Sequence, residues 1–182
     1  MAFIPDFPTN ATLIDVFRAF PTTSKPLLQY HEALMRGPSP LSEAERELIA
    51  AYVSGLNACN YCHGVHTATA AAYGVPESTL AALLDDVATA PVDDKLKPIL
   101  AYVRKLTLTP ARMTEADATA VYAASWSPQA LHDAASVCGV FNLMNRLVDG
   151  LGLKGDAPYF SSAAKRLRGA GGYGGIVERL KL

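Results

Sequence analysis

Apolar and small residues recur every three or four positions along most of the chain, which is the spacing of one face of an α-helix. Alternating runs of β-branched residues, which are typical of half-buried strands, are almost absent. Glycine and proline separate the periodic stretches. The pattern therefore predicts helices at about residues 25–36, 42–58, 77–89, 94–107, 115–125 and 128–151, with a further helix from the Asn57–Asn60 step to Tyr73.

Polar residues stand where several of these helices are expected to begin. Ser42 and Glu45 form the S-x-x-E pattern of a capping box, in which each side chain bonds the backbone N–H of the other residue. Thr114 and the pair Ser127-Pro128 are suitable starts for the last two helices. Gly74, with Pro76 just beyond, is a suitable stop after Tyr73.

Composition agrees with a helical protein. The 182 residues are 50% hydrophobic and include 30 alanines, which favour helix, and the length is sufficient for one hydrophobic core. We expect a single all-α domain at 25–155, an N-terminal arm at 1–24, and a C-terminal tail at 156–182 that packs on the domain or makes oligomer contacts. The sequence GAGGYGG at 169–175 follows no expected strand and has no Lys-Ser/Thr ending, so we interpret it as a flexible turn rather than a phosphate-binding loop.

Charge narrows the possible partners. The formal net charge is −1 and the basic residues form no stripe, which argues against binding to nucleic acid. No apolar run approaches 18 residues, and the first ten residues have no basic segment followed by an apolar one, so no membrane span and a cytoplasmic location are expected. Only 18% of the residues are charged, which leaves more apolar helix surface than one core can absorb and favours a homo-oligomer.

The candidate chemistry is concentrated in the stretch NACNYCHGVH at 57–66. On a helix, Cys59, Cys62 and His66 would lie on one stripe, so His66 could accept the Cys62 proton and Cys59 could close a disulfide with oxidised Cys62. A position near a helix N-terminus favours a thiolate at Cys59, whereas the spacing to His66 favours Cys62. The residues alone leave open which thiol attacks. The third cysteine, Cys138, is expected to be core packing.

Four other interpretations of this stretch remain. CNYCH at 59–63 fits the pattern for covalent attachment of a c-type haem, and the two cysteines with His66 and His63 could ligate zinc. A thioredoxin-like motif would need a βαβ context, which a helical chain does not provide. The two cysteines could also be simple buried residues.

Glu47 is the next candidate. It shares a helix face with the small residues Ala51, Ser54 and Ala58, which would let another helix approach closely and bury the carboxylate. Burial would raise its pKa and suit it to proton transfer. The alternative is an exposed glutamate paired with Arg46.

Together, Glu47, Cys59, Cys62 and His66 give the pattern E-x11-C-x-x-C-x-x-x-H. This pattern resembles the signature of the alkyl hydroperoxidase D (AhpD) group of the carboxymuconolactone decarboxylase superfamily. The segment LSEAERELIAAYVSGLNACNYCHGVH is similar to the core of that group, and VCGVFNLMNRLVDGLGL resembles the C-terminal signature of its peroxidase-related branch. The resemblance covers about residues 25–155.

The resemblance implies an all-helical bundle that forms trimers or hexamers and reduces hydroperoxides without a cofactor or metal. By position, Cys62 corresponds to the peroxidatic thiol, Cys59 to the resolving thiol, His66 to the base and Glu47 to the acid of a proton relay. Tyr61 stands where well-known members have a second histidine, and His63 is a candidate substitute. The implied reductant is an external dithiol, for which the family precedent is a lipoyl-bearing protein.

Two other functions remain open. One is a lactone-processing or decarboxylase activity, as in other members of the superfamily, although those enzymes generally lack the dithiol. The other is a non-catalytic oligomer that senses redox state or binds metal.

Several polar and aromatic residues outside the motif are expected to be mainly structural. We expect a hydrogen-bonded network, or a part of the site wall, among four polar residues at helical spacing. The network candidates are Asn142, Asn145, Arg146 and Asp149, and the residues expected to have packing or structural roles are His31, His132 and Trp126.

Overall fold

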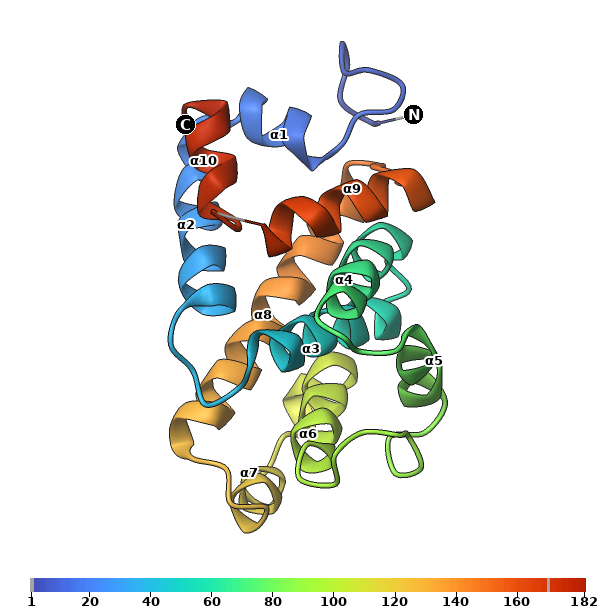
Figure 1. The fold of residues 1–182 in the computed structure, drawn as a ribbon, viewed down its shortest axis with the longest axis vertical. Coiled ribbons are helices and arrows are strands. Elements are labelled where there is room, and N and C mark those ends of the chain that lie inside the picture. Colours follow the sequence, from blue (N-terminus) through green and yellow to red (C-terminus); the bar gives the residue numbers. More distant parts are fainter. Residues whose placement is uncertain (1, 170) are drawn as a thin grey trace.

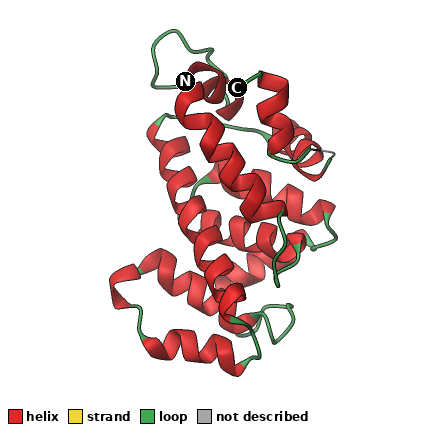
Figure 2. Cartoon of the chain, turned by 90° about the vertical axis from the view of Figure 1, so that its left-hand side faces the viewer, coloured by secondary structure: helices red, strands yellow, loops and turns green. Residues whose placement is uncertain are grey.

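A computed structural model describes residues 2–169 and 171–182, and within these ranges the chain is helical with no strand (Figures 1 and 2). The elements are α1 (Leu13–Ala19), α2 (Pro21–Arg36), α3 (Glu43–Leu56), α4 (Asn60–Ala72), α5 (Glu77–Asp85), α6 (Lys97–Leu108), the 3-10 turn η1 (Pro110–Arg112), α7 (Glu115–Ala123), α8 (Pro128–Gly150), α9 (Ala157–Arg168) and α10 (Gly174–Leu180).

All seven predicted helices are present, so the all-α fold is confirmed, but some ends differ. Helix α2 begins at Pro21 rather than at residue 25, because proline is well suited to the first helical position. Helix α5 ends at Asp85, and the next helix begins only at Lys97. Between them, the carboxylates of Asp86 and Asp93 accept hydrogen bonds from the backbone two residues ahead, which favours turns over helix.

Helix α3 occupies the centre of the molecule and packs against α4, α5, α6 and α8 (Figure 1). Five consecutive residues, 49–53, have no exposed surface, as expected for a helix that is apolar or small on every side. The predicted capping box is confirmed: the Ser42 hydroxyl accepts from the Glu45 backbone N–H, and the Glu45 carboxylate accepts from the Ser42 N–H.

The terminal segments add three helices that the periodicity did not predict. Helices α1, α9 and α10 lie at one end of the molecule, opposite α6 and α7 (Figure 1). Helix α9 packs along α4, and α10 packs against α2, where the Gly174 N–H donates to Glu32 Oε2 at 3.0 Å. The glycine-rich stretch forms a turn with positive φ at Gly171 and Gly172 before α10; its Ala170 lies outside the described residues.

Helix α9 approaches α4 most closely at Gly64. A Cβ atom at this position would lie 2.3 Å from the Phe160 ring, so only glycine leaves room for that side chain. No helix in the described part of the chain is both long enough and apolar enough to cross a membrane.

Candidate active site

A short link between α3 and α4 places the two cysteines. Ala58 takes a left-handed conformation with φ of 55°, and the Cys59 N–H donates to Ser54 O at 3.0 Å. Cys59 thereby becomes the N-cap residue of α4, and Cys62 lies in the first helical turn. Both are buried free thiols, three positions apart at a helix N-terminus.

One turn further along α4, His66 is joined to Glu47 of α3. Its Nδ1 lies 2.7 Å from Glu47 Oε2, and a carboxylate can only accept this bond, so Nδ1 carries the proton. Nε2 is then free to accept a proton. The four residues of the E-x11-C-x-x-C-x-x-x-H pattern therefore lie on α3 and in the N-terminal half of α4, two helices that pack against each other, and Glu47 and His66 are in direct contact.

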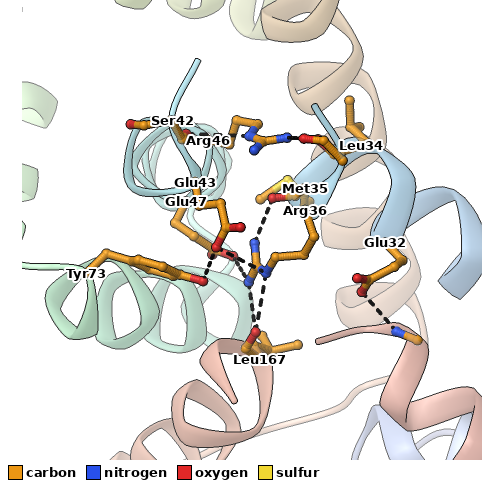
Figure 3. Close-up of polar contacts among 12 residues, drawn as sticks. Glu32, Leu34, Met35, Arg36, Ser42, Glu43, Arg46, Glu47, Tyr73 and Leu167 are labelled. Atoms are coloured by element: carbon orange, nitrogen blue, oxygen red, sulfur yellow. Dashed lines mark hydrogen bonds and ion pairs between the residues drawn. The ribbon is translucent and has the colours of Figure 1, made fainter. Parts of the chain in front are cut away.

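Arg36, at the end of α2, completes this chain of charges (Figure 3). Its Nη2 donates to Glu47 Oε1 at 2.6 Å and to the Leu167 carbonyl at 3.0 Å, while Nη1 donates to the Met35 carbonyl at 2.9 Å. The guanidinium also lies over the rings of Tyr73 and Tyr173. Arg36 thus holds Glu47 from the side opposite to His66.

These contacts reverse the expected acidity of Glu47. The side chain is fully buried, which by itself would raise its pKa, but the charge and hydrogen bond of His66, followed by those of Arg36, lower the pKa below its ordinary value. Glu47 is therefore ionised near pH 7, and it orients His66 and would stabilise its protonated form. The alternative, an exposed Glu47 paired with Arg46, is not found: the Arg46 guanidinium donates to the carbonyl of Leu34 (Figure 3) and to that of Gly37.

The two thiols differ in acidity. A hydrogen bond from Cys62 lowers the pKa of Cys59 despite its burial, whereas donating this bond, together with burial, raises the pKa of Cys62. The first thiolate of the pair is thus favoured at Cys59, which agrees with its position at the helix N-terminus. A thiolate at Cys62 requires transfer of its proton to a base.

The position of the cavity, in contrast, favours Cys62 as the thiol that a substrate would reach. Cys62 and His66 line an apolar cavity of about 70 Å³, and Cys59 is not part of its wall. Helices α1, α2, α8 and α9 supply most of the remaining wall, with Phe141 packed edge-on against the His66 ring at 4.4 Å between ring centroids. At one side, Tyr61 and Tyr159 join their hydroxyl groups, and Tyr61 also accepts from the Leu13 N–H, which ties α4 to α9 and α1.

The other histidines have separate environments. His63 lies outside this cavity: its Nδ1 donates to the Ala51 carbonyl at 2.9 Å, and its ring faces a surface pocket beside Gly64 and Phe160. His31, which was expected to be structural, does line the cavity with Cys62 and His66. His132 is mainly exposed next to Asp133.

The polar residues of α8 form most of the expected network. Asn57 donates to the side-chain oxygens of Asn142 and Asn145, Asn145 donates to the Ser54 hydroxyl, and Arg146 donates to Asn142. Asp149 joins Asn57, Asn145 and Arg146 around a separate surface pocket.

The remaining candidates have packing roles. Cys138 is buried against Thr107 in the core, and the Trp126 indole donates to the Lys95 carbonyl. Among residues 2–169 and 171–182, no three His, Cys, Asp or Glu side chains are grouped as a metal site.

Sequence reasoning missed Arg36 and the role of His31 in the cavity wall. Arg36 lies 11 residues before Glu47, and another of its acceptors, Leu167, is 131 positions away, so no local spacing connects the three residues. The one feature of the sequence that could have drawn attention to Arg36 is its position in the last turn of a helix.

Comparison with known proteins shows a likeness to one family over part of the chain. The model of the carboxymuconolactone decarboxylase family matches residues 21–105, which contain both cysteines, His66, Glu47 and Arg36. The match covers just under half of the 182 residues. No curated protein matches the sequence.

Two solved structures resemble this chain over most of their length. An uncharacterized peroxidase-related protein from Silicibacter sp. TM1040 is 27% identical, with a TM-score of 0.75 over 81% of this chain and 78% of the other. A second, described as an alkylhydroperoxidase AhpD core protein from Ralstonia eutropha JMP134, is 23% identical, with a TM-score of 0.73 over 80% and 76% of the two chains. The shared architecture is therefore that of the AhpD-like fold.

Proposed function

We propose that this protein is a cysteine-dependent peroxidase that reduces hydroperoxides through Cys62 and Cys59. The observation that carries the proposal is the shared cavity of Cys62 and His66, with His66 hydrogen-bonded to a carboxylate that is held ionised. A buried thiol beside a base that is itself oriented by a third group is the arrangement of an activated nucleophile. The likeness to the peroxidase-related protein of Silicibacter supports this choice.

In the first step, His66 Nε2 accepts the Cys62 proton, and Glu47 stabilises the imidazolium that forms. The Cys62 thiolate attacks the terminal oxygen of the hydroperoxide, and the O–O bond breaks. The terminal OH remains on sulfur as a sulfenic acid. The departing alkoxide takes the proton from His66 and leaves as the alcohol.

In the second step, the Cys59 sulfur attacks the Cys62 sulfenic acid and forms a disulfide. The displaced hydroxide takes up the proton that Cys59 gives up, so one water is released. The resolving thiol reacts as its thiolate, and the position of Cys59 at the N-cap of α4 favours that form. An external dithiol then reduces the disulfide, and we propose a lipoyl-bearing protein as its carrier. His63 has no part in this scheme, because it lies outside the cavity.

The test is turnover of tert-butyl hydroperoxide with dihydrolipoamide as the reductant. The Cys62→Ser variant should show no consumption of peroxide. Cys59→Ser should form a sulfenic acid on Cys62 but not turn over, and mass spectrometry of the wild type after one equivalent of peroxide should locate a Cys59–Cys62 disulfide. Cys138→Ser is the matched control and should keep wild-type turnover, because that thiol is packed in the core away from the cavity. Full activity of Cys62→Ser would overturn the proposal.

A further inference from the structure

A second imidazole, that of His31, lines the same cavity as the proposed nucleophile. His31 comes from α2, which is remote in sequence from the cysteine motif, and it is 3% exposed. Both His31 and His66 pack edge-on against the Phe141 ring, with centroid distances of 5.9 and 4.4 Å. The two imidazole rings and the Cys62 thiol therefore line the same cavity.

The hydrogen bond of His31 fixes its tautomer. Its Nδ1 lies 2.8 Å from the Leu27 carbonyl oxygen, which can only accept, so Nδ1 carries the proton. Burial, followed by the proximity of His66, lowers the pKa of His31 to about 4, so the ring is neutral near pH 7. Nε2 then has a free lone pair, and no described residue donates a hydrogen bond to it.

This lone pair fits one feature of a hydroperoxide. The molecule has a single O–H donor, and this donor is on the terminal oxygen, the atom that the thiolate attacks. The other nearby imidazole must keep its lone pair for the Cys62 proton. Since most of the cavity wall is apolar, an O–H group that enters without an acceptor would lose its hydrogen bond to water, at a cost of about 1–3 kcal/mol.

We propose that His31 is a substrate-binding residue of this site, whose Nε2 accepts the hydrogen bond of the hydroperoxide O–H and holds the terminal oxygen at the Cys62 sulfur. This inference rests on the peroxidase function proposed above. His31 gains and loses no proton in the reaction: the hydrogen that it binds stays on the terminal oxygen, first in the hydroperoxide and then in the sulfenic acid. Helix α2 would thereby supply a second histidine side chain to the site, whereas the motif has Tyr61 at the position where the resembled family has its second histidine.

Two amide variants separate the two nitrogens of the ring. In His31→Gln, the amide can place an oxygen near the position of Nε2 but gives up the bond to Leu27. In His31→Asn, the shorter amide can keep the bond to Leu27 but places no acceptor at Nε2. We expect kcat/KM for tert-butyl hydroperoxide to fall about tenfold in His31→Asn, which is the effect of one hydrogen bond, and to fall clearly less in His31→Gln.

Reaction of the Cys62 thiol with methyl methanethiosulfonate shows whether a His31 substitution has only disturbed the structure around Cys62. This reagent has no O–H or N–H group, so it cannot donate a hydrogen bond to His31. The rate of this reaction should be the same in the wild type and in both variants. The exposed His132, in His132→Gln, is the matched control and should leave kcat/KM unchanged.

The inference is overturned if His31→Asn keeps wild-type kcat/KM, if His31→Gln is the more impaired variant, or if the methanethiosulfonate rate falls in proportion to kcat/KM. Failure of the proposed function itself has a different signature: the wild-type protein would then not consume hydroperoxide at all.

Discussion

Glu47 is a charged side chain without any contact with solvent, and it is held by one cation and one imidazole. Removal of one partner from a buried ion pair leaves an uncompensated charge, which costs about 3–5 kcal/mol. We therefore expect Arg36→Met to lower the free energy of unfolding by about this amount, as measured by urea denaturation.

Arg18 provides the comparison for Arg36. Its pairing with Asp15 is long, at 3.8 Å, and the arginine is 64% exposed. Because exposed pairs contribute at most about 1 kcal/mol, Arg18→Met should leave stability nearly unchanged. Equal losses in the two arginine variants would contradict the structural role assigned to Arg36.

The buried imidazole of His31 should make stability depend on pH. Its pKa is about 4 in the folded protein and about 6.5 in the unfolded chain, so between these values only the unfolded state binds the proton. The contribution of neutral, buried His31 to the free energy of unfolding is therefore fully present above pH 6.5, and it is lost as the pH falls toward 4. A difference of about 2.5 pKa units corresponds to about 3 kcal/mol.

This part of the pH dependence should disappear in His31→Phe. The measurement is the free energy of unfolding at several values between pH 7 and pH 4.5, where Glu47, with its lowered pKa, stays ionised. His66 and Glu47 shift the pKa of His31, and Tyr173, whose pKa is raised by burial, packs on its ring; all three remain in the variant. A pH profile identical to that of the wild type would show that His31 is not buried as described.

The thiols, the base and the carboxylate could be found in the sequence because they lie within 20 residues on two successive helices, where spacing determines which side chains meet. His31 and Arg36 could not, since tertiary packing of α2 decides what they contact. The direction of the Glu47 pKa was wrong for the same reason: burial could be inferred from its small neighbours, but the opposing cation was unknown.

The contact between helices α4 and α9 depends on Gly64. In Gly64→Ala, the new methyl group would overlap the Phe160 ring, so α9 or the ring must move. Overpacking of this kind costs about 1–3 kcal/mol, which thermal or urea denaturation would detect.

Gly139 in α8 is the matched control for Gly64. It is also within a helix, but a Cβ atom there meets nothing within 4 Å. Gly139→Ala should therefore stabilise the protein by about 0.5–1 kcal/mol, the usual gain from replacing a helical glycine. Stabilisation by both substitutions would mean that α9 does not pack closely on α4.

The internal helices were predictable because long periodic stretches carry their own boundary residues, as Ser42 and Ser127 do. Helices α1 and α10 have only seven residues each, too few to show a clear period, and they are stabilised by contacts with other helices. Helix α9 was missed although Asp156 caps it, because the glycines on both sides suggested an irregular tail.

The molecule as a whole exposes several large apolar side chains, among them Phe3, Tyr30 and Leu143. We propose a homotrimer or a hexamer, as the family resemblance implies. Analytical ultracentrifugation should then give three or six times the chain mass of 19.3 kDa. A monomer at micromolar concentration would contradict this assembly and would leave the cavity chemistry, which is built within one chain, unaffected.

The origin of the cavity wall has a consequence for related proteins. Both cysteines and the side chains that bind or transfer protons in the proposed mechanism come from residues 21–105, whereas α1, α8, α9 and α10 supply much of the enclosure around them. Under the proposed function, reaction and selectivity would be encoded in different stretches of the chain and could diverge separately. Relatives that share residues 21–105 but differ in the enclosing helices are expected to carry out the same chemistry on hydroperoxides of different shape. Exchange of α9 between two such proteins should therefore transfer substrate preference and leave the catalytic residues of each protein in place.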